Sequence, residues 1–385
     1  MPGIYVHIPF CQKKCFYCDF FSIENLPDIE KFIEYLIKEI DIRSEIWNRT
    51  IGRSKNYEAI FNTVFIGGGT PSLLSAKQMK KITDALKSRF LISGNAEWTV
   101  ETNPGTLNSD SLKKYKKTGF NRISIGVQSF VDSELNFLQR IHNSNEAVKA
   151  ILDSKKAGFF NRNIDIIFSI PGQTIESLRI SMDTINKLMP EHISAYSLIY
   201  EKGTPLYSAL QKNLIQKIED DTDAELYGFI SEFLVSLGYE HYEVSNYALP
   251  GFKCIHNKNY WDRGEYIGLG PSAHGYLNGR RYWNVKTVNS YFKMLDKGEL
   301  PEIGFENLTR ENIISEKIML GIRSEGIKFK EFKKEFNIDL FELGYNNFQE
   351  WKNKGLCEFD KEKIRLNHKG YFICNTLIIQ LVNLI

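Results

Sequence analysis

Short apolar runs alternate with amphipathic stretches over the first two-thirds of the chain. The runs are rich in β-branched and aromatic residues, as buried strands are. Among the helical stretches, Ser75 with Gln78 three residues later has the form of a capping box, and Gly158 follows the helix predicted from Ser144 as a terminator. Strands are predicted at residues 4–10, 61–69, 97–102, 121–126, 163–170, 192–199 and 239–244.

Two segments of this region resemble each other. KKTGFNRISI (116–125) and KKAGFFNRNIDI (155–166) both run from a helix end through a glycine and Asn-Arg into a strand. Repeated βα units build parallel sheets or barrels. Six or so strands are fewer than a closed eight-stranded barrel needs, so the pattern predicts a partial α/β barrel. In such folds chemistry gathers where the loops leave the carboxyl ends of the strands.

The pattern changes twice along the chain. Residues 245–284 are rich in Gly, Tyr, Trp and His, and we expect them to be irregular. After about residue 305 helices dominate, with two short strands near 357–366. We therefore predict a barrel over 1–245, an irregular glycine- and aromatic-rich linker region over 246–304, and a small α+β domain of winged-helix type over 305–385.

Charge argues against a nucleic-acid partner. The 385 residues include 49 basic and 47 acidic side chains, for a net charge of +2. The lysines of KFKEFKKE (328–335) alternate with glutamates, which is typical of a solvated helix face. No apolar run approaches the ~20 residues that span a bilayer, and the first residues lack a signal-peptide layout. We expect a cytoplasmic protein that is not integral to a membrane.

Three of the six cysteines, Cys11, Cys15 and Cys18, lie within eight residues. Thiolates suit iron–sulfur clusters or zinc. Three on one loop can bind three corners of a cubane cluster and leave its fourth iron free for a small ligand. A structural zinc would need a fourth ligand, which His7 or Cys254 could supply. The glycine loop and Glu101 downstream favour the cluster.

YVHIPFCQKKCFYCDF (5–20) resembles the opening signature of the radical SAM superfamily. Within it, the chain is similar to the branch that contains the oxygen-independent coproporphyrinogen III dehydrogenase HemN and the haem chaperone HemW. The resemblance covers nearly the whole chain and implies a partial (β/α)6 TIM-like barrel holding a [4Fe–4S] cluster, with S-adenosylmethionine (SAM) on the open iron. Its further segments are FIGGGTPSLL (65–74), VETNPGTL (100–107), RISIGVQSF (122–130), IDIIFSIPGQT (164–174) and MLGIRSEGI (319–327).

The resemblance also implies which residues bind SAM. Aromatic side chains at the cysteine loop pack against the adenine, the glycine loop binds the methionine amine, and four polar side chains hydrogen-bond the nucleoside and methionine ends. From the residues alone, the glycines are equally compatible with a tight turn, and a carboxylate at a strand end with a helix cap. The matching positions are Tyr5, Phe16, Tyr17, Gly68, Gly69, Thr70, Glu101, Gln128, Arg140 and Asp165.

Two functions of this branch compete: radical oxidative decarboxylation of porphyrinogen propionates, and haem carriage without turnover. The dehydrogenase has an extra cysteine two residues beyond the last cluster cysteine, where this chain has Phe20. Only four residues precede Tyr5, so we expect the dehydrogenase's substrate-covering N-terminal segment to be missing. HNKNYW (256–261) matches the His-Asn-x-x-Tyr-Trp signature that is implicated in haem binding in the chaperones. We favour the haem chaperone.

The motif's chemistry fits haem. A neutral imidazole at His256 can ligate the iron, and Tyr260 and Trp261 offer flat surfaces to a porphyrin, with Asn257 completing the signature. The alternative is that the motif only stabilises a loop, and Cys254 and His274 are reserve ligands. The resemblance implies transfer to haem-acceptor proteins, among them membrane-associated respiratory proteins. It also leaves room for a flavodoxin-type electron donor, a dimer, and a C-terminal domain that acts as a lid or docking surface.

Overall fold

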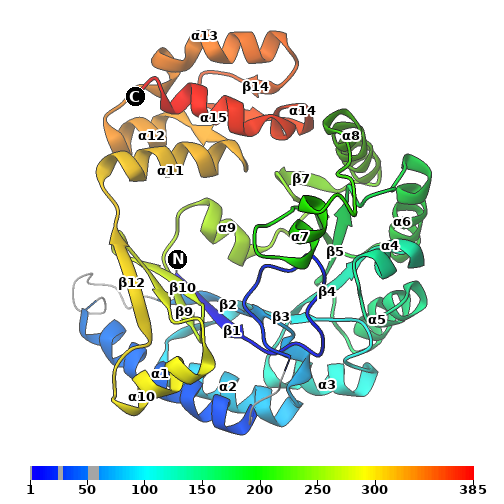
Figure 1. The fold of residues 1–385 in the computed structure, drawn as a ribbon. Helices are drawn as coiled ribbons and strands as arrows, with labels where there is room; N and C mark the ends of the chain where they lie inside the picture. Colours follow the sequence, from blue (N-terminus) through cyan, green and yellow to red (C-terminus); the bar gives the residue numbers. More distant parts are fainter. Residues whose placement is uncertain (1, 25–28, 51–59) are drawn as a thin grey trace.

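The computed structural model describes residues 2–24, 29–50 and 60–385. Six strands run parallel in chain order and form the partial barrel that the repeat predicts (Figure 1). Along β2, Val64 and Ile66 are fully buried on one side, as expected for a sheet covered by helices. The six strands are β1 (Gly3–Ile8), β2 (Phe61–Gly68), β3 (Ile92–Thr102), β4 (Arg122–Gln128), β5 (Arg162–Phe168) and β6 (His192–Ser197).

Helices connect these strands and cover their outer face (Figure 1). The Ser75–Gln78 capping box is present, and Gly158 follows α5 with a φ of +89°, so both predicted helix ends are confirmed. The connecting elements are α1 (Ile29–Thr50), η1 (Pro71–Leu73), α2 (Ala76–Arg89), α3 (Ser109–Thr118), α4 (Asp132–Phe137), α5 (Ser144–Lys156), α6 (Ile175–Leu188), α7 (Pro205–Gln211) and α8 (Asp220–Ser236).

The expectation that 246–304 is irregular is wrong. This region extends the barrel sheet on both sides, because β9 pairs with β1 and β8 pairs with β6. A glycine of this region lets two strands approach closely. A Cβ on Gly268 of β9 would lie 1.8 Å from the His274 carbonyl oxygen, so no larger residue fits there. β7 (Glu240–Glu243), which lies just before this region, pairs with β8. The elements that begin within the region are β8 (Asn246–Ala248), α9 (Ile255–Trp261), β9 (Tyr266–Leu269), β10 (His274–Leu277), β11 (Arg280–Asn284), α10 (Val288–Asp296) and β12 (Glu302–Asn307).

The C-terminal part forms a small α+β unit of winged-helix order, with the predicted strand pair near 357–366 and a third short strand. Phe329, Phe332 and Phe336 are buried, so KFKEFKKE lies on an amphipathic helix whose lysines stand opposite its aromatic face. The elements are α11 (Arg310–Ile322), β13 (Ile327–Lys328), α12 (Phe329–Phe336), α13 (Leu340–Asn353), β14 (Cys357–Phe359), β15 (Lys363–Leu366), α14 (His368–Phe372) and α15 (Cys374–Val382).

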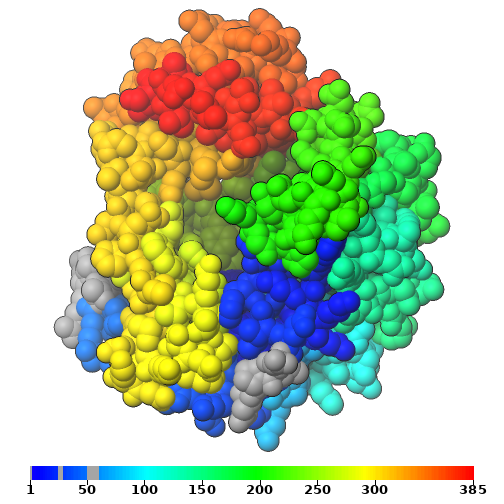
Figure 2. Space-filling view, viewed as in Figure 1, coloured from blue at the N-terminus to red at the C-terminus, as the bar shows by residue number. Residues whose placement is uncertain are grey.

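The surface is hollowed where the barrel meets the C-terminal unit. Figure 2 shows a recess bounded by the C-terminal helices, the strands β9–β12 and α7. The short helix α9 lies between the sheet and the C-terminal unit, and it packs on β2 (Figure 1). Within the described parts of the chain, none of the helices has the length and apolarity that crossing a bilayer requires.

Candidate functional site

The cysteine loop follows β1 and is fastened at both ends. The backbone N–H of Cys11 donates to the Ile23 carbonyl (3.0 Å), and Nε2 of His7 lies 2.9 Å from the Phe21 carbonyl oxygen. Inside the loop, the Cys18 N–H donates to the Cys15 carbonyl (3.2 Å). Burial lowers the pKa of His7 to about 4, so its ring is neutral and stabilises the loop through this contact.

The glycine loop after β2 lies directly against the cysteine loop. The N–H of Gly69 donates to the Ile8 carbonyl (2.8 Å), and the Thr70 hydroxyl donates to the Cys11 sulfur (3.5 Å). A Cβ on Gly69 would lie 2.6 Å from the Phe10 carbonyl oxygen, and one on Gly68 would meet the His7 ring. The missing side chains therefore let the two loops pack together, and a ligand role for these glycines stays a prediction.

Arg140 links the cysteine loop to the ends of β3 and β4. Its Nη1 donates to the Cys15 sulfur (3.1 Å), while Nη2 donates to Asn103 Oδ1 (2.6 Å) and the Gly126 carbonyl (2.9 Å). Asn103 in turn donates to the Thr70 hydroxyl (3.0 Å). We did not predict Asn103 as a binding residue, although its place directly after β3 in the VETNPG segment was a usable signal. Arg140 Nε is buried and has no hydrogen-bond acceptor of its own.

A small cavity opens beside this network. Thr70, Asn103 and Arg140 line it together with Cys15 of the cysteine loop. The guanidinium and the ammonium of Lys13, which also lines it, give the cavity a positive character. Its volume of about 10 Å³ holds one water-sized group, and its positive lining suits one end of a carboxylate.

Two predicted acidic residues meet on the inner face of the sheet. Glu101 accepts the Gly68 N–H (3.0 Å), and Asp165 accepts from Asn163 (2.8 Å) and Ser124 (3.2 Å). Burial, with the nearby Asp165 charge as a second cause, raises the pKa of Glu101 to about 8. Burial also raises the pKa of Asp165. A buried carboxyl group with a raised pKa can accept a hydrogen bond from a polar ligand, or donate one to it when it is protonated.

The other predicted SAM contacts surround this centre. The Tyr5 hydroxyl lies 3.1 Å from His7 Nδ1, and Gln128 is buried in a left-handed conformation (φ 69°) that few such residues adopt. Phe16 and Tyr17 pack on an apolar cluster at the ends of β5 and β6. Most of the ten predicted positions therefore lie at the carboxyl ends of the strands, whereas Tyr5 and Asp165 lie within β1 and β5.

The predicted haem motif lies elsewhere. His256 is 1% exposed, with Nδ1 2.8 Å from the Thr63 hydroxyl and Nε2 2.8 Å from the Tyr260 hydroxyl. It sits at the amino ends of β1 and β2, where a Cβ on Gly3 would touch it. At a rise of ~3.3 Å per residue, this end of β1 lies roughly 16 Å from the strand's carboxyl end at Ile8, beyond which the cysteine loop begins. Both ring nitrogens are engaged, so iron could bind only after one contact breaks.

Burial, with Arg122 as a second cause, lowers the pKa of His256 to about 3, so the imidazole is neutral. Asn257 and Trp261 are half-buried on α9. Cys254, a reserve ligand, is buried at the start of α9 and its sulfur accepts the Asn257 N–H (3.5 Å). His274, the other reserve, is exposed on β10.

Comparison with known proteins gives this geometry a family. The family model of the radical SAM superfamily matches residues 5–185, and that of the HemN C-terminal domain matches residues 308–373. The chain is 35% identical to the heme chaperone HemW of Lactococcus lactis over 97% of this chain and 95% of that protein. It is 34% identical to the heme chaperone HemW of Bacillus subtilis, over 97% of each chain. The chain belongs to the HemW family.

The fold of this HemW family member also matches a solved structure. Coproporphyrinogen III oxidase (HemN) from Escherichia coli, a radical SAM enzyme, superimposes with a TM-score of 0.83 over 100% of this chain and 91% of that one. Their sequences are 21% identical, so the match establishes the fold alone. The predicted radical SAM barrel is confirmed.

The loop residues fit the cluster and SAM that a radical SAM barrel implies. Burial raises the pKa of Cys18 to about 11, and Cys15 and Cys11 add to the shift, so the three sulfurs are electrostatic neighbours. In the described residues, no three His, Cys, Asp or Glu side chains converge on a single metal ion. A cubane does not require such convergence, since each thiolate binds a different iron. The positive lining of the small cavity beside Cys15, with Arg140 and Lys13, suits the carboxylate end of SAM.

Glu101 gives a pH-dependent prediction for the protein without SAM. The pKa of Glu101 in the folded protein, about 8, lies above the usual 4.5 of a glutamate, so folding is penalised as pH rises from 4.5 to 8. Glu101→Gln removes this penalty while keeping an acceptor for Gly68. We expect the variant to gain about 2–4 kcal/mol over wild type at pH 8 and almost nothing at pH 4.5.

Denaturant unfolding at both pH values measures this difference. Glu299→Gln, at an exposed position just after α10, is the control, and its free energy of unfolding should differ from wild type by the same small amount at both pH values. A gain for Glu101→Gln that does not depend on pH would contradict the raised pKa.

Proposed function

We propose that the protein is a haem chaperone that binds haem, a [4Fe–4S] cluster and SAM, and passes haem to acceptor proteins. The observation that carries the proposal is the similarity over 97% of the chain to proteins named heme chaperone HemW. The HNKNYW helix supports it, because α9 holds a neutral imidazole beside tyrosines. Acceptors among membrane-associated respiratory proteins, a flavodoxin-type donor, a dimer and a cytoplasmic location belong to the same proposal.

Two separate sites serve this function in our proposal. Cys11, Cys15 and Cys18 hold the cluster, whose open iron would bind the amine and carboxylate of SAM. Arg140 is the residue we propose to pair with the SAM carboxylate, because it reaches Cys15 and lines the cavity beside it. The haem site lies at α9, with His256 as the axial ligand.

The remaining predicted residues complete the SAM site in the proposal. The apolar cluster at the ends of β5 and β6 offers a surface for the adenine, and the inner carboxyls offer hydrogen bonds to the polar groups. The proposed contacts are Tyr5, Phe16, Tyr17, Gly68, Gly69, Thr70, Glu101, Gln128 and Asp165, and we add Asn103.

The alternative is oxidative decarboxylation of coproporphyrinogen III, which the structural similarity to HemN raises. Phe20 argues against it, because this phenylalanine stands where the dehydrogenase has a cysteine. Its side chain is 69% exposed. An apolar ring at this position can supply neither a thiol donor nor a ligand.

One preparation distinguishes the two functions. Anaerobically reconstituted protein is expected to bind ferric haem in a titration followed at the Soret band. The same protein with SAM, a reductant and coproporphyrinogen III is expected to form no protoporphyrinogen. Turnover above a cluster-free control would establish the enzyme instead, and failure to bind haem would refute the chaperone.

A further inference from the structure

The inner face of the barrel carries buried polar side chains near the amino ends of β5 and β6. Barrel interiors are usually filled by branched apolar residues, because a buried polar group costs free energy unless it is hydrogen-bonded. Here Asn163 of β5, His192 of β6 and Tyr242 of the neighbouring β7 are buried and bonded to one another. We call these three residues the polar relay.

The polar relay joins Asp165, a predicted SAM contact, to the start of α9. Asn163 Nδ2 donates to Asp165 Oδ1 (2.8 Å), and Asn163 Oδ1 lies 2.6 Å from His192 Nδ1. His192 Nε2 lies 2.7 Å from the Tyr242 hydroxyl. The Cys254 N–H, at the cap of α9, donates to the same hydroxyl (3.3 Å). An unbroken series of hydrogen bonds therefore connects the SAM side of the barrel with the helix that carries HNKNYW.

Every bond of the polar relay points the same way. The Asn163 amide nitrogen donates to Asp165, so its oxygen accepts, which places the hydrogen of His192 on Nδ1. Burial, with Arg122 as a second cause, holds the pKa of His192 well below its usual range. The ring is therefore neutral, and Nε2 accepts from Tyr242. Bonds in such a series polarise one another, so a change at one end reaches the other.

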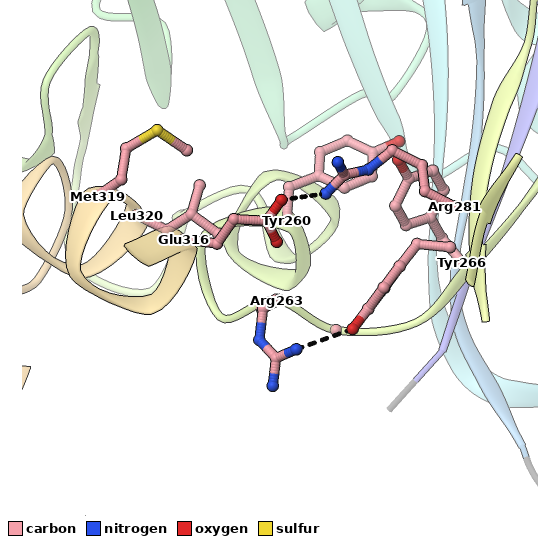
Figure 3. A pocket seen from close by; sticks show the side chains of 9 residues that line it. Tyr260, Arg263, Tyr266, Arg281, Glu316, Met319 and Leu320 are labelled. Atoms are coloured by element: carbon pink, nitrogen blue, oxygen red, sulfur yellow. Dashed lines mark hydrogen bonds and ion pairs between the residues drawn. The ribbon is translucent and has the colours of Figure 1, made fainter. Parts of the chain in front are cut away.

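The placement of α9 depends on the contacts at its start. Its end borders a cavity of about 240 Å³ between the barrel and the C-terminal unit, which Tyr260 lines together with Met319 of α11 (Figure 3). Packing at that end is therefore incomplete. At the start, Tyr242 holds the cap residue, and Glu97 of β3 accepts the N–H of His256 (3.1 Å). These buried contacts fix the first turn of the helix.

We propose that Asn163, His192 and Tyr242 are positioning residues that couple SAM binding to haem binding. A SAM hydroxyl that donates to Asp165 shares the carboxylate with Asn163 and weakens the bond between these two residues. The weakening passes along the polar relay and loosens the hold of Tyr242 on the start of α9. His256 then exchanges a hydrogen-bond partner for iron at a lower cost, so SAM favours haem binding. The proposal rests on the proposed function and adds the regulation of its haem site.

Haem titrations with and without SAM test the coupling. Ferric haem is added to the anaerobically reconstituted full chain and followed at the Soret band, with no reductant present, so that SAM stays intact. Wild type is expected to bind haem about three-fold more tightly with SAM, which is part of the effect of one hydrogen bond. Because coupling between two sites is reciprocal, haem should tighten SAM binding by the same factor in equilibrium dialysis.

Tyr242→Phe interrupts the polar relay and keeps the aromatic ring. We expect this variant to bind haem equally with and without SAM, whereas a purely structural role would change both affinities and keep their ratio. Asn163→Ala interrupts the relay at the SAM end and should abolish the ratio as well. Tyr239→Phe is the matched control, because this buried hydroxyl donates to the Pro190 carbonyl (2.5 Å), outside the relay. It should keep the three-fold effect.

The outcomes separate the coupling from the haem site itself. Equal haem affinities with and without SAM, in wild type that binds SAM, overturn the coupling. A three-fold effect that survives in Tyr242→Phe or in Asn163→Ala overturns the role of the polar relay. Wild type that binds no haem at all refutes the proposed function instead.

Discussion

Replacing Cys15 with alanine is expected to abolish the iron–sulfur cluster. Three thiolates hold the cubane in our proposal, and Cys15 is also the one that Arg140 contacts at 3.1 Å. Without it, two protein ligands remain and a second iron loses its thiolate. After anaerobic reconstitution, the brown charge-transfer absorbance and the acid-labile sulfide should fall to the level of the unreconstituted protein.

Cys374→Ala is the matched control for this loss. Cys374 is buried at the start of α15 in the C-terminal unit, far along the chain from the cysteine loop, and its replacement should leave sulfide and absorbance unchanged. Retained cluster absorbance in Cys15→Ala would show that Cys15 is not a ligand. Zinc without labile sulfide in wild type would favour the structural-zinc alternative.

Replacing Glu97 with alanine is expected to lower the free energy of unfolding by about 3–5 kcal/mol. Glu97 is a buried residue of β3 whose carboxylate accepts the backbone N–H groups of Ile255 (3.2 Å) and His256 (3.1 Å) at the start of α9. The Cys254 thiol also donates to it (3.5 Å), and the buried Arg122 lies 4.0 Å away. Alanine removes these acceptors and leaves the arginine without its counter-charge.

Glu97 also positions the haem motif, so its loss should have a second effect. Because α9 has only seven residues, its packing decides where it sits. We expect Glu97→Ala to disturb the Soret band of bound haem, whereas Glu97→Gln keeps an acceptor and restores much of the wild-type spectrum.

Glu191→Ala is the control, because it breaks another ion pair of a buried arginine, Arg162–Glu191 (2.7 Å), in which Glu191 accepts no hydrogen bond from α9. It should destabilise the chain and leave the haem spectrum unchanged. A cost below about 1 kcal/mol for Glu97→Ala, or an equal spectral change in Glu191→Ala, would contradict the positioning role.

The local sequence pattern was sufficient to predict the fold where strands and helices alternate along the chain. The six parallel strands, the Ser75 cap and the stop at Gly158 depend on burial periodicity and on backbone preferences of single residues. The same reasoning predicted an irregular segment over 246–304, which was wrong, because we took its glycines to indicate loops. There Gly268 lets the His274 backbone approach, which is a contact between strands.

For the sites, the sequence alone determined the cysteine triplet, since a short loop must place its thiols near each other. It did not determine the state of His256. That residue contacts Thr63 of β2, 193 residues earlier, and the sequence around HNKNYW does not indicate that β2 lies beside it. Only the tertiary structure decides that the imidazole is buried behind Tyr260, because burial and hydrogen bonding there come from chain segments that meet in space and not in sequence.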